Sequence, residues 1–401
     1  MLFRRTPFGL LVACIALLAA APAHALDRAA VGAKLARETA KLGAASGAHV
    51  VDLDAGTVLF SRRPDLALVP ASNEKLFVTA TALLTLGADA RRETVVADDA
   101  VALSDPKAIA TQNLYVIGAG DPSLANADLA SLADQLVRQS GLTRVAGGVV
   151  GDESLLDARR GSVDSSFKPD FNLGGQLGAL VVGHGTTDRV GPAHLVAARL
   201  QAMLKARGVR FGRRARTGRA PADAEELATD RSPPISDLVR ATNRPSDNFY
   251  AELLLKVLGA EEGAAGTTAA GAIVARRRLA QLGLRPTISD GSGLSRGNRT
   301  NARQVVTLLR AMRRGVASAA WLDSLSVVGR NGTLRRRMRG TAAAGRCSGK
   351  TGTLRGVSAL SGYCTTTTGR HVVFSFLENG VGPGAKSVED RIVAALARYE
   401  G

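Results

Sequence analysis

Three short polar motifs, separated by long stretches of chain, constrain how this sequence can fold. In chain order they are Ser-Asn-Glu-Lys at Ser72 to Lys75, Ser-Asp-Asn at Ser246 to Asn248, and Lys-Thr-Gly-Thr starting at Lys350. This ordered S-x-x-K, S-D-N and K-T-G set is typical of sites in which a serine attacks an acyl group. One site can use all three only if the fold brings distant parts of the chain together.

A serine acyl-transfer site needs a nucleophile, a base, an oxyanion hole and groups that hold the substrate. We expect Ser72 to be the nucleophile at a helix start, and Lys75, one turn later, to be its base. Ser246 would relay a proton to the leaving amine, and Asn248 would hold Lys75 or a substrate carbonyl. Each motif alone also fits a plain capped helix, so the ordered set carries the prediction.

The Lys350 motif is expected on an edge strand beside the substrate. Lys350 would supply positive charge, and the hydroxyls of Thr351 and Thr353 would bind a substrate carboxylate. Gly352 would let the substrate backbone lie close, and the Thr353 N–H would complete the oxyanion hole with that of Ser72. The alternative for this segment alone is an ordinary strand with a glycine bulge.

Lysine is scarce in this chain, since only nine of its 52 basic residues are Lys. Two of the nine, Lys75 and Lys350, stand in the motifs. A catalytic base must lose its proton, which a buried ammonium can do and a guanidinium effectively cannot. The presence of Lys at position 75 therefore supports a chemical role.

The two ends of the chain predict complementary parts of one sheet. Apolar periodicity and turn residues indicate the elements in both regions. They are a helix over 29–42 and strands over 48–53 and 57–61, then strands over 346–354, 357–366 and 371–377 and a helix over 388–399. We expect a mixed α/β (α+β) fold with an antiparallel sheet flanked by helices.

The middle of the chain divides into helical segments and inserted material. Helices are predicted over 74–86, 235–242, 248–258, 267–282 and 302–312. The stretch between the first two motifs differs from these helical segments. It is predicted to hold short strands over 113–117, 145–150 and 179–182 and a helix over 192–207. We therefore predict a discontinuous catalytic domain, 26–88 with 229–401, and one or more accessory domains within 89–228.

The N-terminus reads as an export signal over residues 1–25. Arg4 and Arg5 precede an apolar run, and Ala23-His24-Ala25 supplies a cleavage pattern. Cleavage at a lipoprotein site at Cys14 is the alternative. We expect an exported protein, located in the periplasm or associated with the cell wall.

The formal net charge of +17 favours anionic surroundings, such as a cell-wall polymer or a membrane surface. Nucleic acid is not expected, because four Tyr and one Trp offer little to stack bases on. The His residues lack ligand spacing, and Gly118-Ala119-Gly120 lacks the rest of a dinucleotide loop, so we expect no metal or cofactor. The sequence makes no prediction of the oligomeric state.

The motifs resemble those of the D-alanyl-D-alanine carboxypeptidase/endopeptidase family of penicillin-binding proteins, the low-molecular-mass class C type. The likeness covers about residues 30–400. Further segments that carry it are Pro70-Ala71-Ser72-Asn73, Gly120-Asp121-Pro122-Ser123, Asp290-Gly291-Ser292-Gly293-Leu294-Ser295 and Gly332-Thr333-Leu334. The resemblance implies a transpeptidase-like fold shared with β-lactamases, with extra domains between the first two motifs.

The resemblance also implies a site aspartate in the first inserted domain, which contacts the diamino acid of the peptide. Asp152 is the best match, although it could equally be a turn residue. One segment departs from the family pattern, at Val181-Val182-Gly183-His184-Gly185, where a Ser/Asn-rich stretch is more usual.

Two cysteines, Cys347 and Cys364, remain beyond the predicted leader. If the last strands form a hairpin that turns at Arg355-Gly356, these two residues face each other. We predict a cross-strand disulfide, which an exported protein favours over two free thiols.

The predicted function is that of a serine D-Ala-D-Ala carboxypeptidase or DD-endopeptidase acting on peptidoglycan peptides through an acyl-enzyme. β-Lactams are the expected covalent inhibitors. The alternatives are a β-lactamase, for which no deacylating glutamate is assignable, and a wall-binding or β-lactam-sensing protein without turnover.

Overall fold

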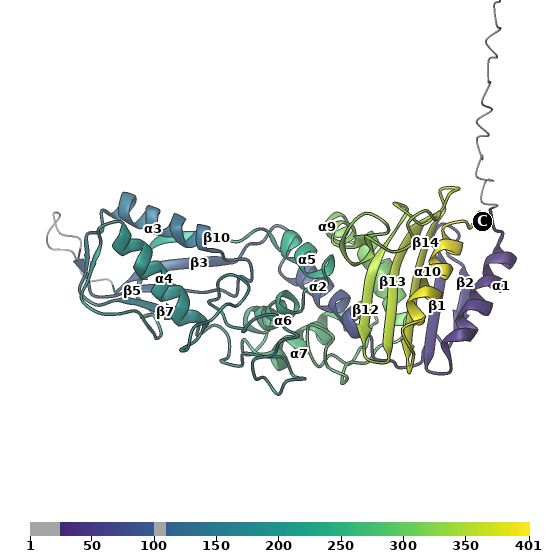
Figure 1. Ribbon diagram of the computed structural model, residues 1–401, viewed down its shortest axis with the longest axis horizontal. Coiled ribbons are helices and arrows are strands. Elements are labelled where there is room, and N and C mark those ends of the chain that lie inside the picture. Colours follow the sequence, from purple (N-terminus) through teal and green to yellow (C-terminus); the bar gives the residue numbers. More distant parts are fainter. Residues whose placement is uncertain (1–24, 100–109) are drawn as a thin grey trace, which may run out of the picture.

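The computed structural model describes residues 25–99 and 110–401. The predicted leader lies outside these residues, except for Ala25. Figure 1 shows an elongated molecule with a sheet toward each end and a group of helices between them. Within the described ranges, no helix is long and apolar enough to cross a membrane.

A six-stranded antiparallel sheet joins the two ends of the chain, as predicted. The strands lie in the order β11 (Ser326–Val327), β12 (Cys347–Leu354), β13 (Val357–Thr365), β14 (His371–Asn379), β1 (Ser46–Asp52) and β2 (Val58–Arg62). The sheet closes where β14, from the C-terminal region, pairs with β1 from the N-terminal region. The mixed fold with an antiparallel sheet flanked by helices is confirmed.

Both faces of this sheet are covered at its centre, since every residue of β1 and eight of the nine residues of β13 are buried. In β1, Val50 packs into the cluster beneath α1 (Arg28–Thr39) and α10 (Ala385–Leu396), whereas Val51 packs into the opposite cluster. Phe376 and Leu377 in β14 alternate in the same way. The period of two therefore assigns side chains to two separate cores.

Helices cover the face of the sheet opposite α1 and α10. They are α2 (Glu74–Thr85), α5 (Ile235–Asn243), α6 (Asn248–Glu262), α7 (Thr268–Ala280), α8 (Ala302–Arg314) and α9 (Ser318–Asp323). Their buried residues form one cluster with β1, β13 and β14. The predicted helices in these regions are confirmed to within a few residues at their ends.

The stretch between the first two motifs forms a separate sheet with its own core. Its strands lie in the order β10 (Glu225–Arg231), β3 (Glu93–Asp98), β5 (Leu114–Ile117), β7 (Val149–Asp152) and β9 (Arg216–Thr217). A smaller sheet holds β4 (Ala110–Thr111), β6 (Arg144–Val145) and β8 (Arg210–Phe211). Helices α3 (Asn126–Ser140) and α4 (Pro192–Ala206) pack on this core (Figure 1).

The strand expected over residues 179–182 is wrong. Only Val182 makes an isolated bridge, with Thr186, and the segment is otherwise irregular. Its apolar pattern has another cause, because Leu180 and Val182 pack into the core of the inserted region while Ala179 and Val181 pack beside Phe249. A connection buried between two cores can thus imitate the pattern of a strand.

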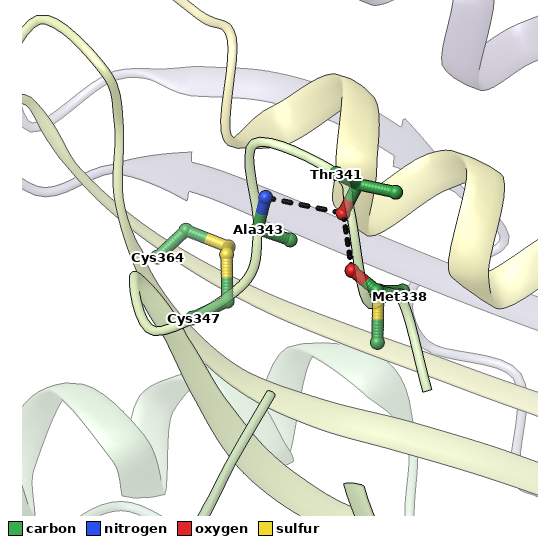
Figure 2. Close-up of a disulfide and its surroundings, with 5 residues drawn as sticks. All are labelled: Met338, Thr341, Ala343, Cys347 and Cys364. Atoms are coloured by element: carbon green, nitrogen blue, oxygen red, sulfur yellow. Dashed lines mark hydrogen bonds between the residues drawn. A yellow bond between two sulfur atoms is a disulfide. The ribbon is translucent and has the colours of Figure 1, made fainter. Parts of the chain in front are cut away.

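The predicted disulfide is confirmed. Cys347 and Cys364 are register partners in the β12–β13 hairpin, and their sulfur atoms are bonded (Figure 2). The turn before β12 is closed by Thr341, whose hydroxyl donates to the Met338 carbonyl and accepts from the Ala343 N–H. The bond fastens the start of the strand that carries Lys350 to its neighbour.

Candidate active site

Ser72 lies in a short 3-10 helix, η2 (Ala71–Asn73), directly before α2. Ala71 precedes it with a φ of 47°, in the left-handed region that non-glycine residues rarely adopt. Such a backbone persists only where the surroundings enforce it. Here Asn73 donates from Nδ2 to the Lys350 carbonyl at 3.2 Å, which ties the serine turn to β12.

Lys75, one turn after Ser72, is fully buried, and its ammonium lies among three acceptors. Its Nζ is 3.1 Å from the Ser72 Oγ, 2.7 Å from the Asn248 Oδ1 and 2.5 Å from the Ser292 carbonyl oxygen. Burial lowers the pKa of Lys75 to about 8, although the charges of Asp290 and Glu252 oppose this shift. A lysine in this state can accept a proton near neutral pH.

Two carboxyl groups shape the loop that presents the Ser292 carbonyl to Lys75. Glu252 accepts through Oε1 from the backbone N–H groups of Gly291 at 3.1 Å and Ser292 at 2.9 Å. Asp290 accepts from Gly293 at 2.9 Å, and all of these carboxyl oxygens are buried. Burial, followed by the charge of Asp290, raises the pKa of Glu252 to about 7.

Glu74 adds a third buried carboxyl beside this loop. Neither of its oxygens has a hydrogen-bond partner among the described residues. Burial first, and the charge of Asp290 second, raise its pKa well above the ordinary value. An unpartnered carboxyl at this depth is held as the neutral acid, because its charged form is not solvated.

Ser246 and Lys350 meet on the other side of the site. The Lys350 Nζ donates to the Ser246 Oγ at 2.7 Å and to the Thr351 carbonyl at 2.9 Å. Ser246 has a φ of 66°, so a second motif residue occupies the left-handed region. Burial, and then the charge of Lys75, hold the pKa of Lys350 well below its usual range.

The glycine of the third motif is required by a close approach of two backbones. A Cβ on Gly352 would lie 2.7 Å from the Pro70 carbonyl oxygen and 3.1 Å from the Ala359 Cβ. Thr351, beside it, donates its hydroxyl hydrogen to the Thr333 Oγ1 at 2.8 Å, and Thr353 is exposed. The strand β12 can therefore lie against the serine turn only with glycine at this position.

Asn248, the first residue of α6, has its amide oriented by two contacts. Its Oδ1 accepts from Lys75, and its Nδ2 donates to the Asn172 carbonyl at 2.7 Å. Asp247 caps α6 by accepting from the Tyr250 N–H at 3.0 Å. The structure thus brings Ser72, Lys75 and Asn248 together.

Asp152 is placed differently from the motif residues. It ends β7 and is buried, and its carboxylate accepts from the backbone N–H groups of Ser154 at 2.8 Å and Ala220 at 2.7 Å. These bonds hold a turn of the inserted region, and Asp152 makes no hydrogen bond to Ser72 or Lys75. Across residues 25–99 and 110–401, no group of three or more His, Cys, Asp or Glu could hold a metal ion.

Several residues of the site were missed by the sequence reasoning. Glu252 follows Asn248 by one helical turn on α6, a spacing that could have signalled it. Glu74 occupies an unspecified position of the S-x-x-K motif and gives no signal. Ser292 lies in the segment Asp290–Ser295 that carries the family resemblance, but its role was not predicted. Like Asn172, it acts through a backbone carbonyl, which residue type does not reveal.

Comparison with known proteins places these motifs in a family. The model of the D-Ala-D-Ala carboxypeptidase 3 (S13) family matches residues 28–174 and 171–399. A D-alanyl-D-alanine carboxypeptidase of an Actinomadura species is 33% identical, over 90% of this chain and 82% of its own length. A carboxypeptidase of Mycobacterium tuberculosis is 27% identical over 88% of this chain and 80% of its own.

Solved structures share the fold at lower identity. Penicillin binding protein 4 of Haemophilus influenzae matches with a TM-score of 0.77 and 20% identity, covering 90% of this chain and 98% of that one. A predatory endopeptidase of Bdellovibrio bacteriovorus, acylated by penicillin G, matches with a TM-score of 0.52 and 17% identity over 87% and 89% of the two chains.

Proposed function

Because the chain belongs to the D-Ala-D-Ala carboxypeptidase 3 (S13) family, we propose that it is a serine D-Ala-D-Ala carboxypeptidase and DD-endopeptidase acting on peptidoglycan stem peptides. One observation carries the proposal: the buried Lys75 ammonium lies 3.1 Å from the Ser72 hydroxyl, with a pKa of about 8. This arrangement supplies a nucleophile and a base that can take its proton.

In the proposed reaction, Lys75 acts in its neutral form, and its Nζ accepts the hydroxyl proton while Ser72 Oγ bonds to the peptide carbonyl carbon. The backbone N–H groups of Ser72 and Thr353 stabilise the resulting oxyanion. Collapse of the tetrahedral intermediate breaks the C–N bond, and the leaving amine receives a proton through Ser246. Water then attacks the ester, which releases the shortened peptide and returns the proton to Ser72.

The substrate carboxylate of D-Ala is assigned to the face of β12 that carries the third motif. Lys350 provides the positive charge, and the hydroxyls of Thr351 and Thr353 donate hydrogen bonds. Because Thr351 donates to Thr333 in the free protein, its hydroxyl would exchange that partner for the carboxylate. The same groups would recognise the carboxylate of a penicillin, which supports β-lactams as covalent inhibitors.

The test measures acylation and turnover in one series. Fluorescent penicillin should label the wild-type protein and fail to label Ser72→Ala, whereas Ser131→Ala on α3, an exposed serine, should label normally. D-Ala should be released from a pentapeptide, and a cross-linked dimer should be cleaved. Persistent labelling of Ser72→Ala would refute the assigned nucleophile.

The same assays separate this proposal from its alternatives. A β-lactamase would release hydrolysed penicillin rapidly, whereas the proposed enzyme should remain acylated. A wall-binding protein without turnover would release no D-Ala. Export to the periplasm or cell wall belongs to the proposal too, because its substrate is located there, and fractionation of cells expressing the full chain tests it.

The same proposal treats residues 89–228 as an accessory domain inserted into the catalytic domain. Its five-stranded sheet has its own core, which supports a domain inserted between the first two motifs. Within it, Asp152 remains a proposed contact for the diamino acid of the peptide, and Asp152→Asn tests this through the KM for pentapeptides with and without that residue. An unchanged KM for both peptides would exclude the contact.

A further inference from the structure

A segment of the inserted region, residues 172–185, lies against the second motif. Its first residue, Asn172, accepts from the Asn248 Nδ2 at 2.7 Å. Its His184 lies 2.9 Å, through Nε2, from the Asp247 Oδ2. Two successive motif residues are therefore held by one segment, which departs from the family pattern at His184.

Both nitrogens of the His184 ring face groups that can accept a hydrogen bond. Nδ1 lies 3.2 Å from the Gly174 carbonyl oxygen, and Nε2 faces the Asp247 carboxylate. The other oxygen of that carboxylate accepts from the Tyr250 N–H. A neutral imidazole has one N–H, so it can satisfy only one partner, whereas the imidazolium satisfies both.

The surroundings of the ring are shaped to receive it. The ring centroid lies 4.5 Å from that of Phe249 and 5.9 Å from that of Tyr250. A Cβ on Gly174 would lie 3.1 Å from the His184 Cε1, and one on Gly185 would lie 2.5 Å from the Phe249 ring. The glycines thus allow the segment to close around this side chain.

Among the described residues, the charged and titratable groups in contact with the ring come from the start of α6. They are Asp247, which pairs with Nε2, and Tyr250, whose pKa burial raises to about 12. Tyr250 is therefore neutral over the working range, and Asp247 is the charged partner that the ring holds.

We propose that His184 is a positioning residue, which holds Asp247 through Nε2 and, together with the Asn172 carbonyl, keeps the Asn248 amide oxygen facing Lys75. The consequence follows from the geometry of that amide. If the segment loosens, Asn248 is free to turn, and Lys75 loses an acceptor 2.7 Å away. The inference rests on the proposed acyl-enzyme function and adds a residue outside its three motifs.

Two substitutions separate the hydrogen bond from the rest of the side chain. His184→Ala removes the donor to Asp247, whereas His184→Gln keeps an N–H that can reach it. Rescue by His184→Gln therefore isolates the contact with Asp247.

The experiment measures the second-order rate constant for acylation by a fluorescent penicillin at one neutral pH. His184→Ala should acylate about 10²-fold more slowly than the wild type, the scale expected for a misplaced catalytic group. His184→Gln should recover most of the wild-type rate.

The matched control is His194→Gln. His194 lies in the same inserted region and forms a similar pair with Asp188 at 2.6 Å, away from the motifs. This variant should acylate at the wild-type rate. A wild-type acylation rate for His184→Ala, with its melting temperature unchanged or lowered, would overturn the proposal, since a merely structural role moves only stability.

The two proposals fail in distinguishable ways. If the wild-type protein shows no Ser72-dependent labelling, the acyl-enzyme function is wrong. If the wild type is labelled and His184→Ala acylates at the wild-type rate, only the positioning role is wrong. Melting temperatures identify variants that have unfolded.

Discussion

Breaking the Cys347–Cys364 disulfide tests how strongly the third motif depends on its covalent tie. The perturbation is reduction of a protein expressed from residue 26 onward, which omits Cys14, or the double variant Cys347→Ala with Cys364→Ala. Both sulfur atoms are buried within the hairpin of β12 and β13. Reduction leaves them in place, so it isolates the bond, whereas the double variant also removes packing.

The expected magnitude follows from the chain that the bond closes in the unfolded state. The two cysteines are 17 residues apart, and loop-closure entropy for that length gives about 3 kcal/mol. For a catalytic domain of this size, the loss should lower the melting temperature by about 6–12 °C. The double variant should lose at least as much.

The assay is thermal unfolding with and without reductant, together with thiol titration after denaturation. Non-reduced protein should yield no free thiol, and reduced protein should yield two. Two free thiols without reductant, or an unchanged melting temperature after complete reduction, would refute the reasoning. Penicillin acylation well below the melting temperature should persist, because the ladder from Cys347 to Leu354 still holds Lys350.

Three further substitutions test separate parts of the site. Lys75→Arg replaces a base with a pKa of about 8 by a permanent cation, and it should slow penicillin acylation by about 10³-fold. An acylation rate near that of the wild type would contradict the assignment of Lys75 as the base. Gly352→Ala places a Cβ 2.7 Å from the Pro70 carbonyl, so acylation should fall by about 10²-fold, and normal acylation at a normal melting temperature would exclude the predicted clash. Glu74→Gln should gain stability relative to wild type as the pH rises from about 4 to 7. The folded-state pKa of Glu74 is raised, so the stability that its protonated form contributes is present below the pKa of the unfolded chain and is lost as the pH rises above it. A difference in melting temperature that does not change with pH would argue against a neutral, buried Glu74.

The sequence predicted the parts of the fold that depend on local pattern. The register of the last hairpin is set by its turn, so pairing Cys347 with Cys364 needed only the position of Arg355-Gly356. Ser72 at a helix start and Lys75 one turn later likewise follow from helical spacing. These predictions required no knowledge of distant contacts.

Other parts depend on contacts between distant segments and could not be predicted in this way. The apolar run at 179–182 was read as a strand because burial between two cores produces the same residue types. The Asn172 carbonyl and the Ser292 carbonyl reach Asn248 and Lys75 through folding alone. Residue type predicts side-chain chemistry, but it does not identify which backbone groups complete a site.

The two buried lysines differ in a way that bears on how the proposed enzyme begins its reaction. Lys75 lies near the carboxyl groups of Asp290 and Glu252, which favour its charged form, whereas burial and the charge of Lys75 both disfavour charge on Lys350. In the free protein, Lys350 is therefore the easier of the two to deprotonate.

A bound substrate carboxylate would reverse this order. Its negative charge beside Lys350 favours the ammonium there. Because the charge of Lys75 lowers the pKa of Lys350, an ammonium on Lys350 would in turn favour the neutral form of Lys75, since repulsion between like charges is mutual. The proton would pass to the lysine that binds the substrate and leave the one that must act as base. On this reasoning, a substrate without its terminal carboxylate should lose acylation rate as well as affinity, and amidation of the terminal D-Ala should lower kcat/KM more than the binding constant. An amidated peptide that binds weakly but reacts at the normal rate once bound would show that the two lysines titrate independently.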